Sequence, residues 1–365
     1  MKFVDEFRDP RLARALLERI RERARRPVRL MEFCGGHTHA ILRFGIRQAL
    51  PPTVEMLSGP GCPVCVTAAA DLDRAIALAD VPGVILASFG DMIRVPGSRE
   101  SLQQAKARGA DVRVVYSPLD AVRLAEQNPS RPVIFLGVGF ETTAPGVAAS
   151  ILDARTRNVR NYYVLGLHKL TPPATRAILD SGEVNLSGVL GPGHVTTVIG
   201  TDAWGFLPRE YGVPIAIAGF EPLDILRGIS MLVEQIAAGE ARVDNAYSRS
   251  VLPEGNRAAL DVMNRVFEVA DAEWRGLGVI SASGLRIRAE FAAHDAAGAF
   301  PVDVPPSRER AGCRCGDVLR GVLAPPSCPL FRRVCTPENP VGPCMVSAEG
   351  ACAAYYQYGG AADEA

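Results

Sequence analysis

The chain has 365 residues, 48% of them hydrophobic, so it is long enough for two or three domains that each bury a core. Its 40 Lys and Arg residues balance 40 Asp and Glu residues, and this formal net charge of zero argues against a nucleic-acid-binding protein. We therefore expect partners that are proteins or small molecules, and no nucleic acid.

The first segment, residues 1–26, has the pattern of an amphipathic helix, with leucines and an isoleucine at helical spacing between charged residues. It lacks the apolar centre of a secretory signal, and its acidic residues argue against a transit peptide. Apolar runs elsewhere are far shorter than the roughly 20 residues of a membrane span. We expect a soluble, cytoplasmic protein with no membrane contact, in which clustered cysteines serve metal or redox chemistry.

Short apolar runs in the middle of the chain predict buried strands, because they lack the alternation of a half-buried strand. These runs are residues 84–89, 112–116, 133–138, 162–167, 189–190 and 215–218. Amphipathic segments separate them. This alternation predicts an α/β fold with parallel strands and helices on both faces.

Two of the intervening helices have clear start signals. Ser117 and Thr171 are each followed by proline, the pairing of an N-cap residue with Pro at the first helical position, and the helices should end near Asn128 and Gly182. Further helices are expected at residues 221–238 and 256–274.

Most predicted strands end in loops of glycine, proline and small polar residues, where open α/β sheets place their sites. Gly59-Pro60-Gly61-Cys62 resembles Gly191-Pro192-Gly193-His194, a short internal echo that suggests two related α/β units. In these loops Asp91, Glu141 and Glu221 could equally well cap a turn or serve function. His168 and His194 are slightly more often structural, and His294 is expected to be structural.

Six of the nine cysteines lie within 40 residues near the C-terminus: Cys313, Cys315, Cys328, Cys335, Cys344 and Cys352. Thiolates bind iron-sulfur clusters, zinc or copper(I). Zinc sites usually present two short cysteine pairs, and this segment has one, so the spacing favours a cluster modestly. Spacing alone does not choose four ligands from six.

A second cysteine centre is divided between Cys34-Gly35-Gly36-His37 and the Cys62-x-x-Cys65 pair. The pair could be a dithiol/disulfide couple or half of a metal site. Two glycines let backbone or ligand approach Cys34 closely, and His37 could bind metal or transfer protons. A lone cysteine in an α/β protein is more often a small buried apolar residue.

Seven segments in order give the chain a strong resemblance to the hydrogenase maturation protein HypD family. They are FCGGHTHAI at 33–41, LSGPGCPVCVT at 57–67, FGDMIRVPGS at 89–98, VGFETTAPG at 138–146, GPGHVTTVIG at 191–200, IAGFEPLDIL at 217–226, and CRCGDVLRG with CPLFRRVCTPENPVGPCMVSAEGACAAYY in the C-terminal segment. One small departure is Arg332-Arg333, where a glycine is expected; it lies between ligands and should not remove one.

The resemblance implies a 4Fe-4S cluster on the family spacing Cys-x14-Cys-x6-Cys-x16-Cys. This spacing falls on Cys313, Cys328, Cys335 and Cys352. Cys315 and Cys344 are then expected to be non-ligands.

It also implies that Cys34 binds an iron ion together with a cysteine of a HypC-type small chaperone, that His37 assists there, and that Cys62 and Cys65 are redox-active. Two α/β units plus a mainly helical, cysteine-rich domain are implied for the fold. The expected ranges are 1–30, a helical segment packing on the C-terminal domain; 31–147, an α/β domain with Cys34, Cys62 and Cys65; 148–235, a second α/β domain; and 236–365, the helical cluster domain.

The implied function is a scaffold on which iron receives cyanide and carbonyl ligands before transfer to the large-subunit precursor of a NiFe hydrogenase. A HypE-type protein would donate the cyanide, and the cluster and the Cys62/Cys65 pair would supply electrons. Such a scaffold need not turn over like an enzyme. The alternatives are an iron-sulfur thiol-disulfide oxidoreductase acting on proteins and a zinc-stabilised interaction protein.

Overall fold

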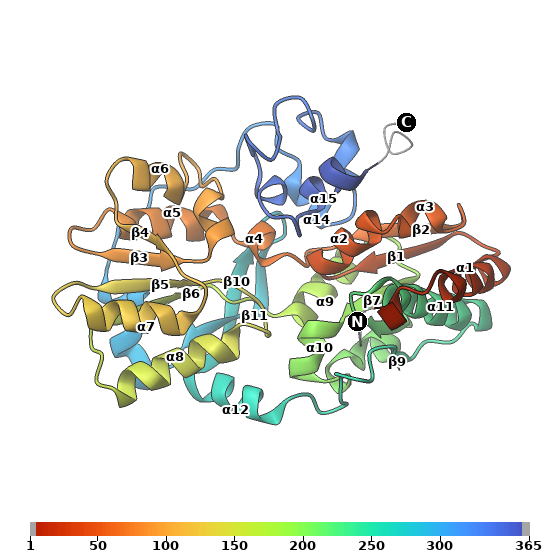
Figure 1. Ribbon diagram of the computed structural model, residues 1–365, viewed down its shortest axis with the longest axis horizontal. Coiled ribbons are helices and arrows are strands. Elements are labelled where there is room, and N and C mark those ends of the chain that lie inside the picture. The colour runs from red at the N-terminus through yellow and green to blue at the C-terminus, as the bar shows by residue number, and fades with distance from the viewer. Residues whose placement is uncertain (1–4, 360–365) are drawn as a thin grey trace.

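The computed structural model describes residues 5–359, which form two parallel α/β units with a cysteine-rich region lying above and between them (Figure 1). The expected fold class is therefore confirmed. No helix among the described residues is both long and apolar enough to cross a membrane.

The first unit is built on a five-stranded parallel sheet in the order β2-β1-β7-β8-β9. One face carries α1, α2, α3 and α11, and the other carries α9, α10 and two short helical turns. Its strands are β1 Val28–Glu32, β2 Val54–Ser58, β7 Gly188–Pro192, β8 Ile215–Ala218 and β9 Val243–Asn245. Its helices are α1 Pro10–Arg23, α2 Gly35–Arg43, α3 Ile46–Ala49, α9 Thr171–Ser181, α10 Gly193–Ile199 and α11 Pro222–Ala238.

The second unit is a four-stranded parallel sheet in the order β4-β3-β5-β6. Helices α5 and α6 pack on one face, and α7, α8 and α12 pack on the other. The strands are β3 Ile85–Ser88, β4 Val112–Val114, β5 Val133–Gly137 and β6 Tyr162–Gly166. The helices are α5 Ala69–Ala79, α6 Leu102–Ala107, α7 Pro118–Gln127, α8 Ala144–Thr156 and α12 Arg257–Val266.

The two sheets do not follow the expected ranges 31–147 and 148–235. Strand β1 pairs with β2 on one side and with the much later β7 on the other, where Leu30 lies in register with Gly188, and β8 and β9 extend the same sheet. The four-stranded unit is thus inserted between β2 and β7. Helix α1 packs along α11, where Arg19 pairs with Glu234, so it belongs to the five-stranded unit and not to the C-terminal domain.

The helix expected at residues 256–274 ends at Val266, and the prediction is wrong beyond that residue. Strand β10 Phe267–Trp274 follows and pairs antiparallel with β11 Gly278–Ile287. Phe267 is buried in the core of the four-stranded unit and Trp274 in that of the five-stranded unit. An extended chain advances about 3.3 Å per residue and a helix about 1.5 Å, so only the strand spans both cores.

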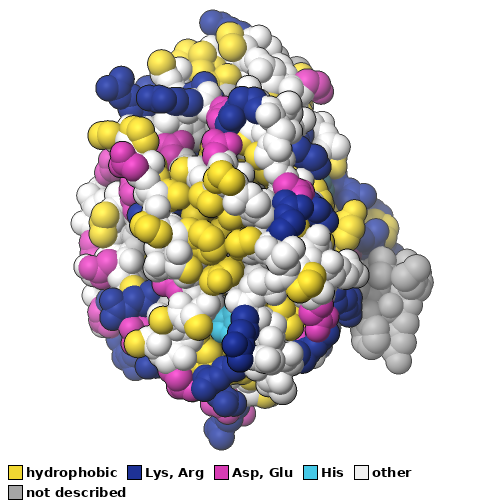
Figure 2. Space-filling view, turned by 90° about the vertical axis from the view of Figure 1, so that its left-hand side faces the viewer, with side chains coloured by type: hydrophobic (Ala, Val, Ile, Leu, Met, Phe, Trp, Pro, Cys, Tyr) yellow, Lys and Arg dark blue, Asp and Glu magenta, His cyan; other side chains and the backbone are white. Residues whose placement is uncertain are grey.

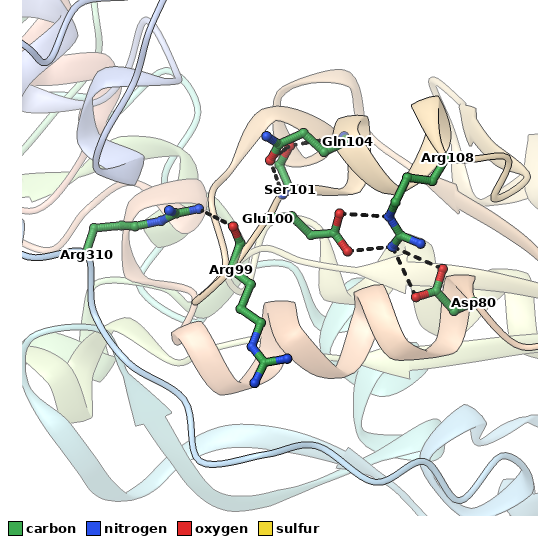
Figure 3. A network of polar contacts seen from close by, with 7 residues as sticks. All are labelled: Asp80, Arg99, Glu100, Ser101, Gln104, Arg108 and Arg310. Carbon is green, nitrogen blue, oxygen red and sulfur yellow. Dashed lines mark hydrogen bonds and ion pairs between the residues drawn. The ribbon is translucent and has the colours of Figure 1, made fainter.

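An irregular segment, residues 300–312, runs along the four-stranded unit before the first C-terminal cysteine. Arg310 donates hydrogen bonds to the carbonyls of Gly97 and Arg99, next to a polar network in which Arg108 pairs with Glu100 and Asp80 (Figure 3). Figure 2 looks onto this end of the molecule, where acidic and basic side chains are interspersed around a central group of hydrophobic ones. The segment thereby fixes the path of the chain into the cysteine-rich region.

The cysteine-rich region consists mainly of turns with two short helices, α14 Cys315–Leu319 and α15 Ala351–Tyr358. Helix α15 packs against α2, which directly follows Cys34. The cysteine-rich region has a small core of its own, which contains Phe331, Met345 and Tyr355. The C-terminal cysteines are thus held close to the start of the five-stranded unit.

Candidate functional site: two linked cysteine centres

Three neighbouring strands deliver Cys62, Cys34 and His194 to one edge of the five-stranded sheet. Cys34 follows β1, while the Gly-Pro-Gly turns that follow β2 and lie at the end of β7 lead to Cys62 and His194. Carboxyl ends of parallel strands are where α/β folds place their sites. The sequence echo between these turns therefore reflects two strands that flank β1 in one sheet, not two separate units.

Cys34 is the N-cap residue of α2 and is 3% exposed. Its Sγ lies 3.6 Å from Nδ1 of His194. The ring of Phe220 lies between the two histidines of the site, with centroids 4.9 Å from His37 and 5.4 Å from His194. His194 was slightly favoured as a structural residue from sequence, and the structure instead places it beside the Cys34 sulfur.

Burial raises the pKa of the Cys34 thiol, and the nearby Glu349 and Glu32 raise it further. The backbone N–H groups of His37 and Gly36 oppose this shift. Burial also lowers the pKa of His194 to about 4. The site therefore pairs a neutral thiol with a neutral imidazole. When a metal cation binds the sulfur and displaces the thiol proton, the imidazole can accept that proton or bind the metal itself.

An open cleft of about 370 Å³ leads to Cys34. Charged side chains surround its mouth, where Arg8 pairs with Glu221. The lining residues that matter here are Cys34, His194, Phe220, Arg43, Phe44 and Glu349. The Cys34 thiol is thus almost fully buried, yet it can be reached from solvent through this cleft.

The side chain of His37 is directed at β8, because its Nε2 donates to the carbonyls of Gly219 at 2.9 Å and Ala218 at 3.2 Å. Its Nδ1 is buried without a partner among the described residues. Burial lowers the pKa of His37 to about 4. His37 ties α2 to the end of β8, and its expected assistance at the Cys34 site stays a prediction.

Cys62 is the N-cap residue of the single turn of α4, Pro63–Val66, and Cys65 lies within that turn; they are 4% and 0% exposed. Burial raises the pKa of the Cys65 thiol, which interacts with the thiols of Cys62 and Cys344. Cys65 Sγ also lies 4.0 Å from the carbonyl of Pro343. Cys65 therefore faces the C-terminal cysteines directly, and Cys62 lies beside it.

Cys315 and Cys344, expected only to be non-ligands, are the link between the centres. Their sulfurs are 2.6 Å apart, and both are free thiols close enough to form a disulfide after a small movement. Cys344 also interacts with Cys65 and Cys352, and Cys315 with Cys313. Sequence could not reveal this pair, because its members are 29 residues apart and only the fold brings them together.

All six C-terminal cysteines, among them the four expected cluster ligands Cys313, Cys328, Cys335 and Cys352, line one small cavity of about 20 Å³ together with apolar side chains. Val341 N–H donates to Cys335 Sγ at 3.4 Å, and a Cβ at Gly342 would overlap the Cys313 sulfur. Within residues 5–359 no three His, Cys, Asp or Glu side chains converge on a point suited to one metal ion. Thiols are the ligand type that an iron-sulfur cluster or a zinc ion takes, so the donor set fits either group.

Among the other candidate residues, Glu141 and His294 have structural roles. Glu141 accepts hydrogen bonds from the backbone N–H and the hydroxyl of Thr171, so it caps α9. His294 bonds to the carbonyl of Tyr162. His168 is buried with both ring nitrogens unpartnered among the described residues. Asp91 is exposed and lies close to Glu349.

Comparison with known proteins gives a consistent result over nearly the whole length. The family model HypD, described as "Hydrogenase formation hypA family", matches residues 11–359. The hydrogenase maturation factor HypD of Azotobacter vinelandii is 50% identical over 368 residues, 98% of this chain and 97% of the relative. Those of Rhodobacter capsulatus and Escherichia coli (strain K12) are 49% and 47% identical over 373 and 366 residues, covering 99% and 98% of both chains.

Proposed function

The chain belongs to the HypD family of hydrogenase maturation factors, and on this premise we propose that it is a cytoplasmic scaffold on which an iron ion receives its cyanide and carbonyl ligands. A HypC-type small chaperone shares the iron, a HypE-type protein donates cyanide, and the finished unit passes to the large-subunit precursor of a NiFe hydrogenase. Neither nucleic acid nor a membrane takes part.

The observation that carries this proposal is the placement of Cys34 and His194 at the base of an open cleft. Cyanide and carbonyl favour low-spin ferrous iron, which needs a soft thiolate donor and open coordination positions. Iron binding deprotonates the Cys34 thiol, and the neutral imidazole of His194, 3.6 Å away, can take the proton. The remaining positions face the cleft, where the chaperone's cysteine can enter.

Electrons reach the Cys62/Cys65 pair through thiols that lie close together in the fold. A 4Fe-4S cluster on Cys313, Cys328, Cys335 and Cys352 would supply them one at a time. Starting from a Cys62–Cys65 disulfide, the Cys344 thiolate attacks Cys65 and Cys62 leaves as a thiolate. Cys315 then attacks Cys344 and releases Cys65, so the disulfide passes to Cys315 and Cys344. Two electrons and two protons return that pair to thiols.

The central experiment is anaerobic co-purification with the small chaperone, followed by iron and sulfide analysis and infrared spectroscopy. We expect four cluster irons plus a further iron with cyanide and carbonyl bands. A colourless protein that contains zinc would overturn the cluster, and a coloured protein without these bands would leave only an electron-transfer role.

The relay has its own test in Cys62→Ser. This variant should keep the cluster but load iron with ligands far more slowly when the cluster is reduced. If reduction of the cluster still drives loading at the normal rate, the relay is wrong.

A thiol-disulfide oxidoreductase acting on other proteins is the second candidate. Exchange with an external protein needs an accessible thiol, whereas Cys65 is fully buried and Cys62 nearly so. Cys65 faces the protein's own C-terminal cysteines, which favours an internal electron path.

A further inference from the structure

Glu32 is a buried carboxyl whose three partners are neutral donors at the start of α2. It is 1% exposed, at the end of β1. It accepts the backbone N–H of Cys34 at 2.8 Å, the hydroxyl of Thr38 in a short hydrogen bond, and the hydroxyl of Ser58 in register on β2. Burying a carboxyl group destabilises a fold unless its hydrogen bonds compensate for the lost hydration. Stability alone therefore gives little reason for a glutamate at this position.

The start of α2 lacks the side-chain cap that usually fixes the first turn of a helix. Its N-cap residue is Cys34, whose side chain makes no regular capping hydrogen bond. Ser, Thr, Asp or Asn would normally fill this role. The next two residues are glycines, which impose no backbone conformation of their own. An iron ligand carried on such a turn needs another group to fix it.

Glu32 supplies this restraint from the inner side of the turn. One carboxyl oxygen holds the N-cap residue Cys34 and the other holds Thr38, one helical turn later. The backbone of Gly61 packs against the Cys34 backbone and accepts the N–H of Gly35 at 3.1 Å. The clamp leaves the Cys34 sulfur directed at His194 and the cleft.

We propose that Glu32 is a positioning residue that holds Cys34 in the geometry required to bind iron. This inference rests on the proposed iron-binding role of Cys34. Glu32 does not touch the iron itself; it acts through the Cys34 backbone and the first turn of α2.

The test compares two variants that both lack the carboxyl group. Glu32→Gln keeps an acceptor for the Cys34 N–H and an amide group for the Thr38 hydroxyl, whereas Glu32→Met keeps only the shape. In the iron-free full chain, iodoacetamide should alkylate Cys34 about fivefold faster in Glu32→Met than in Glu32→Gln, the effect of one lost hydrogen bond on opening of the turn. Thr38→Val, which keeps the Glu32 carboxyl group, should raise the rate above that of the unmodified chain. Glu55→Gln, on the exposed side of β2, is the control.

Equal alkylation rates in the two Glu32 variants, with no change in Thr38→Val, would overturn the proposal. Thr38→Val decides the question if Glu32→Met fails to fold. Infrared spectra of loaded protein give a second measurement: the cyanide and carbonyl bands should keep their positions in Glu32→Gln and shift or broaden in Glu32→Met. Absence of these bands in the unmodified protein would contradict the scaffold function but leave the alkylation comparison valid.

Discussion

The contact between Cys34 and His194 is the feature on which function depends most at the level of single residues. His194→Ala removes the neutral imidazole 3.6 Å from the sulfur while leaving the C-terminal cysteines unchanged. We expect the affinity of the Cys34 site for iron to fall at least about tenfold, as for partners of metal ligands elsewhere. Iron analysis with infrared spectroscopy measures this, and an unchanged yield of cyanide and carbonyl bands would contradict it.

Glu141 predicts a pH dependence of stability. Burial raises its pKa to about 7, against about 4.5 when exposed, although the Thr171 hydrogen bonds oppose the shift. The folded state holds this proton more tightly, so the stabilisation is complete below about pH 4.5 and is lost as the pH rises through 7.

Glu141→Gln should remove this dependence. Between pH 5 and pH 8 its free energy of unfolding should gain about 3 kcal/mol relative to the unmodified protein, the equivalent of the pKa shift. Urea unfolding at both pH values measures the difference. Glu273→Gln, at an exposed position on β10, is the control, and parallel pH profiles for Glu141→Gln and the unmodified chain would refute the assignment.

Whether the sequence could identify an individual site residue depended on the motif in which that residue lies. Cys34, Cys62 and Cys65 lie in short motifs of glycine, proline and histidine that mark a site locally. His194 lies in a similar motif, but its importance comes from Cys34, 160 residues earlier. The sequence does not indicate a role for Glu32, because a glutamate at the end of an apolar strand is common and only the structure shows that it is buried.

At the level of elements, the six apolar runs predicted as strands are confirmed as β3 to β8, because buried parallel strands are nearly continuous in hydrophobic residues. The predicted helices that begin near Pro118 and Pro172 are likewise confirmed, and they end at Gln127 and Ser181. Strands β1 and β2 escaped notice because arginine and glutamate interrupt them. Strand β10 was missed because its conformation depends on the two cores at its ends.

The turn that carries Gly342 makes a prediction about the cluster. A methyl group there would overlap the sulfur of Cys313, so Gly342→Ala should displace that ligand. We expect loss of most of the iron, acid-labile sulfide and visible absorbance. Gly146→Ala is the matched control, because a Cβ at that position in α8 meets nothing within 4 Å and should stabilise the helix by up to about 1 kcal/mol. Full cluster content in Gly342→Ala would argue against Cys313 as a ligand.

For the whole molecule, the packing of the cysteine-rich region between the two units creates the proposed relay. Cys344 is the member that contacts both Cys65 and Cys315. In Cys344→Ser the cluster should remain. Once the cluster has been reduced, however, the Cys62–Cys65 disulfide should be reduced at less than about one tenth of the rate in the unmodified protein, because the attacking thiolate is absent. Thiol labelling during anaerobic titration follows this. A normal rate in Cys344→Ser would show that electrons reach Cys65 by another path.

Domain boundaries were the least predictable part of the whole. The order of elements along the chain correctly indicated α/β architecture, but strand order within a sheet is a long-range property. The pairing of β1 with β7 joins residues about 160 positions apart, and no local pattern at Leu30 or Gly188 announces it.

This inserted topology also dictates an order of events during synthesis. All four strands of the four-stranded unit and its helices α5 to α8 lie within residues 69–166, so this part can begin to fold before α12, which completes one face, leaves the ribosome. Strands β1 and β2, made earlier, must wait for β7 to β9 before their sheet can close. Cys34, Cys62 and Cys65 are therefore exposed to solvent for a period before the sheet closes. Cys65 meets its partner Cys344 only as the last helix emerges. We expect oxidation to damage the nascent chain more than the finished protein, so that oxygen present during synthesis lowers the yield of active factor more than oxygen added afterwards.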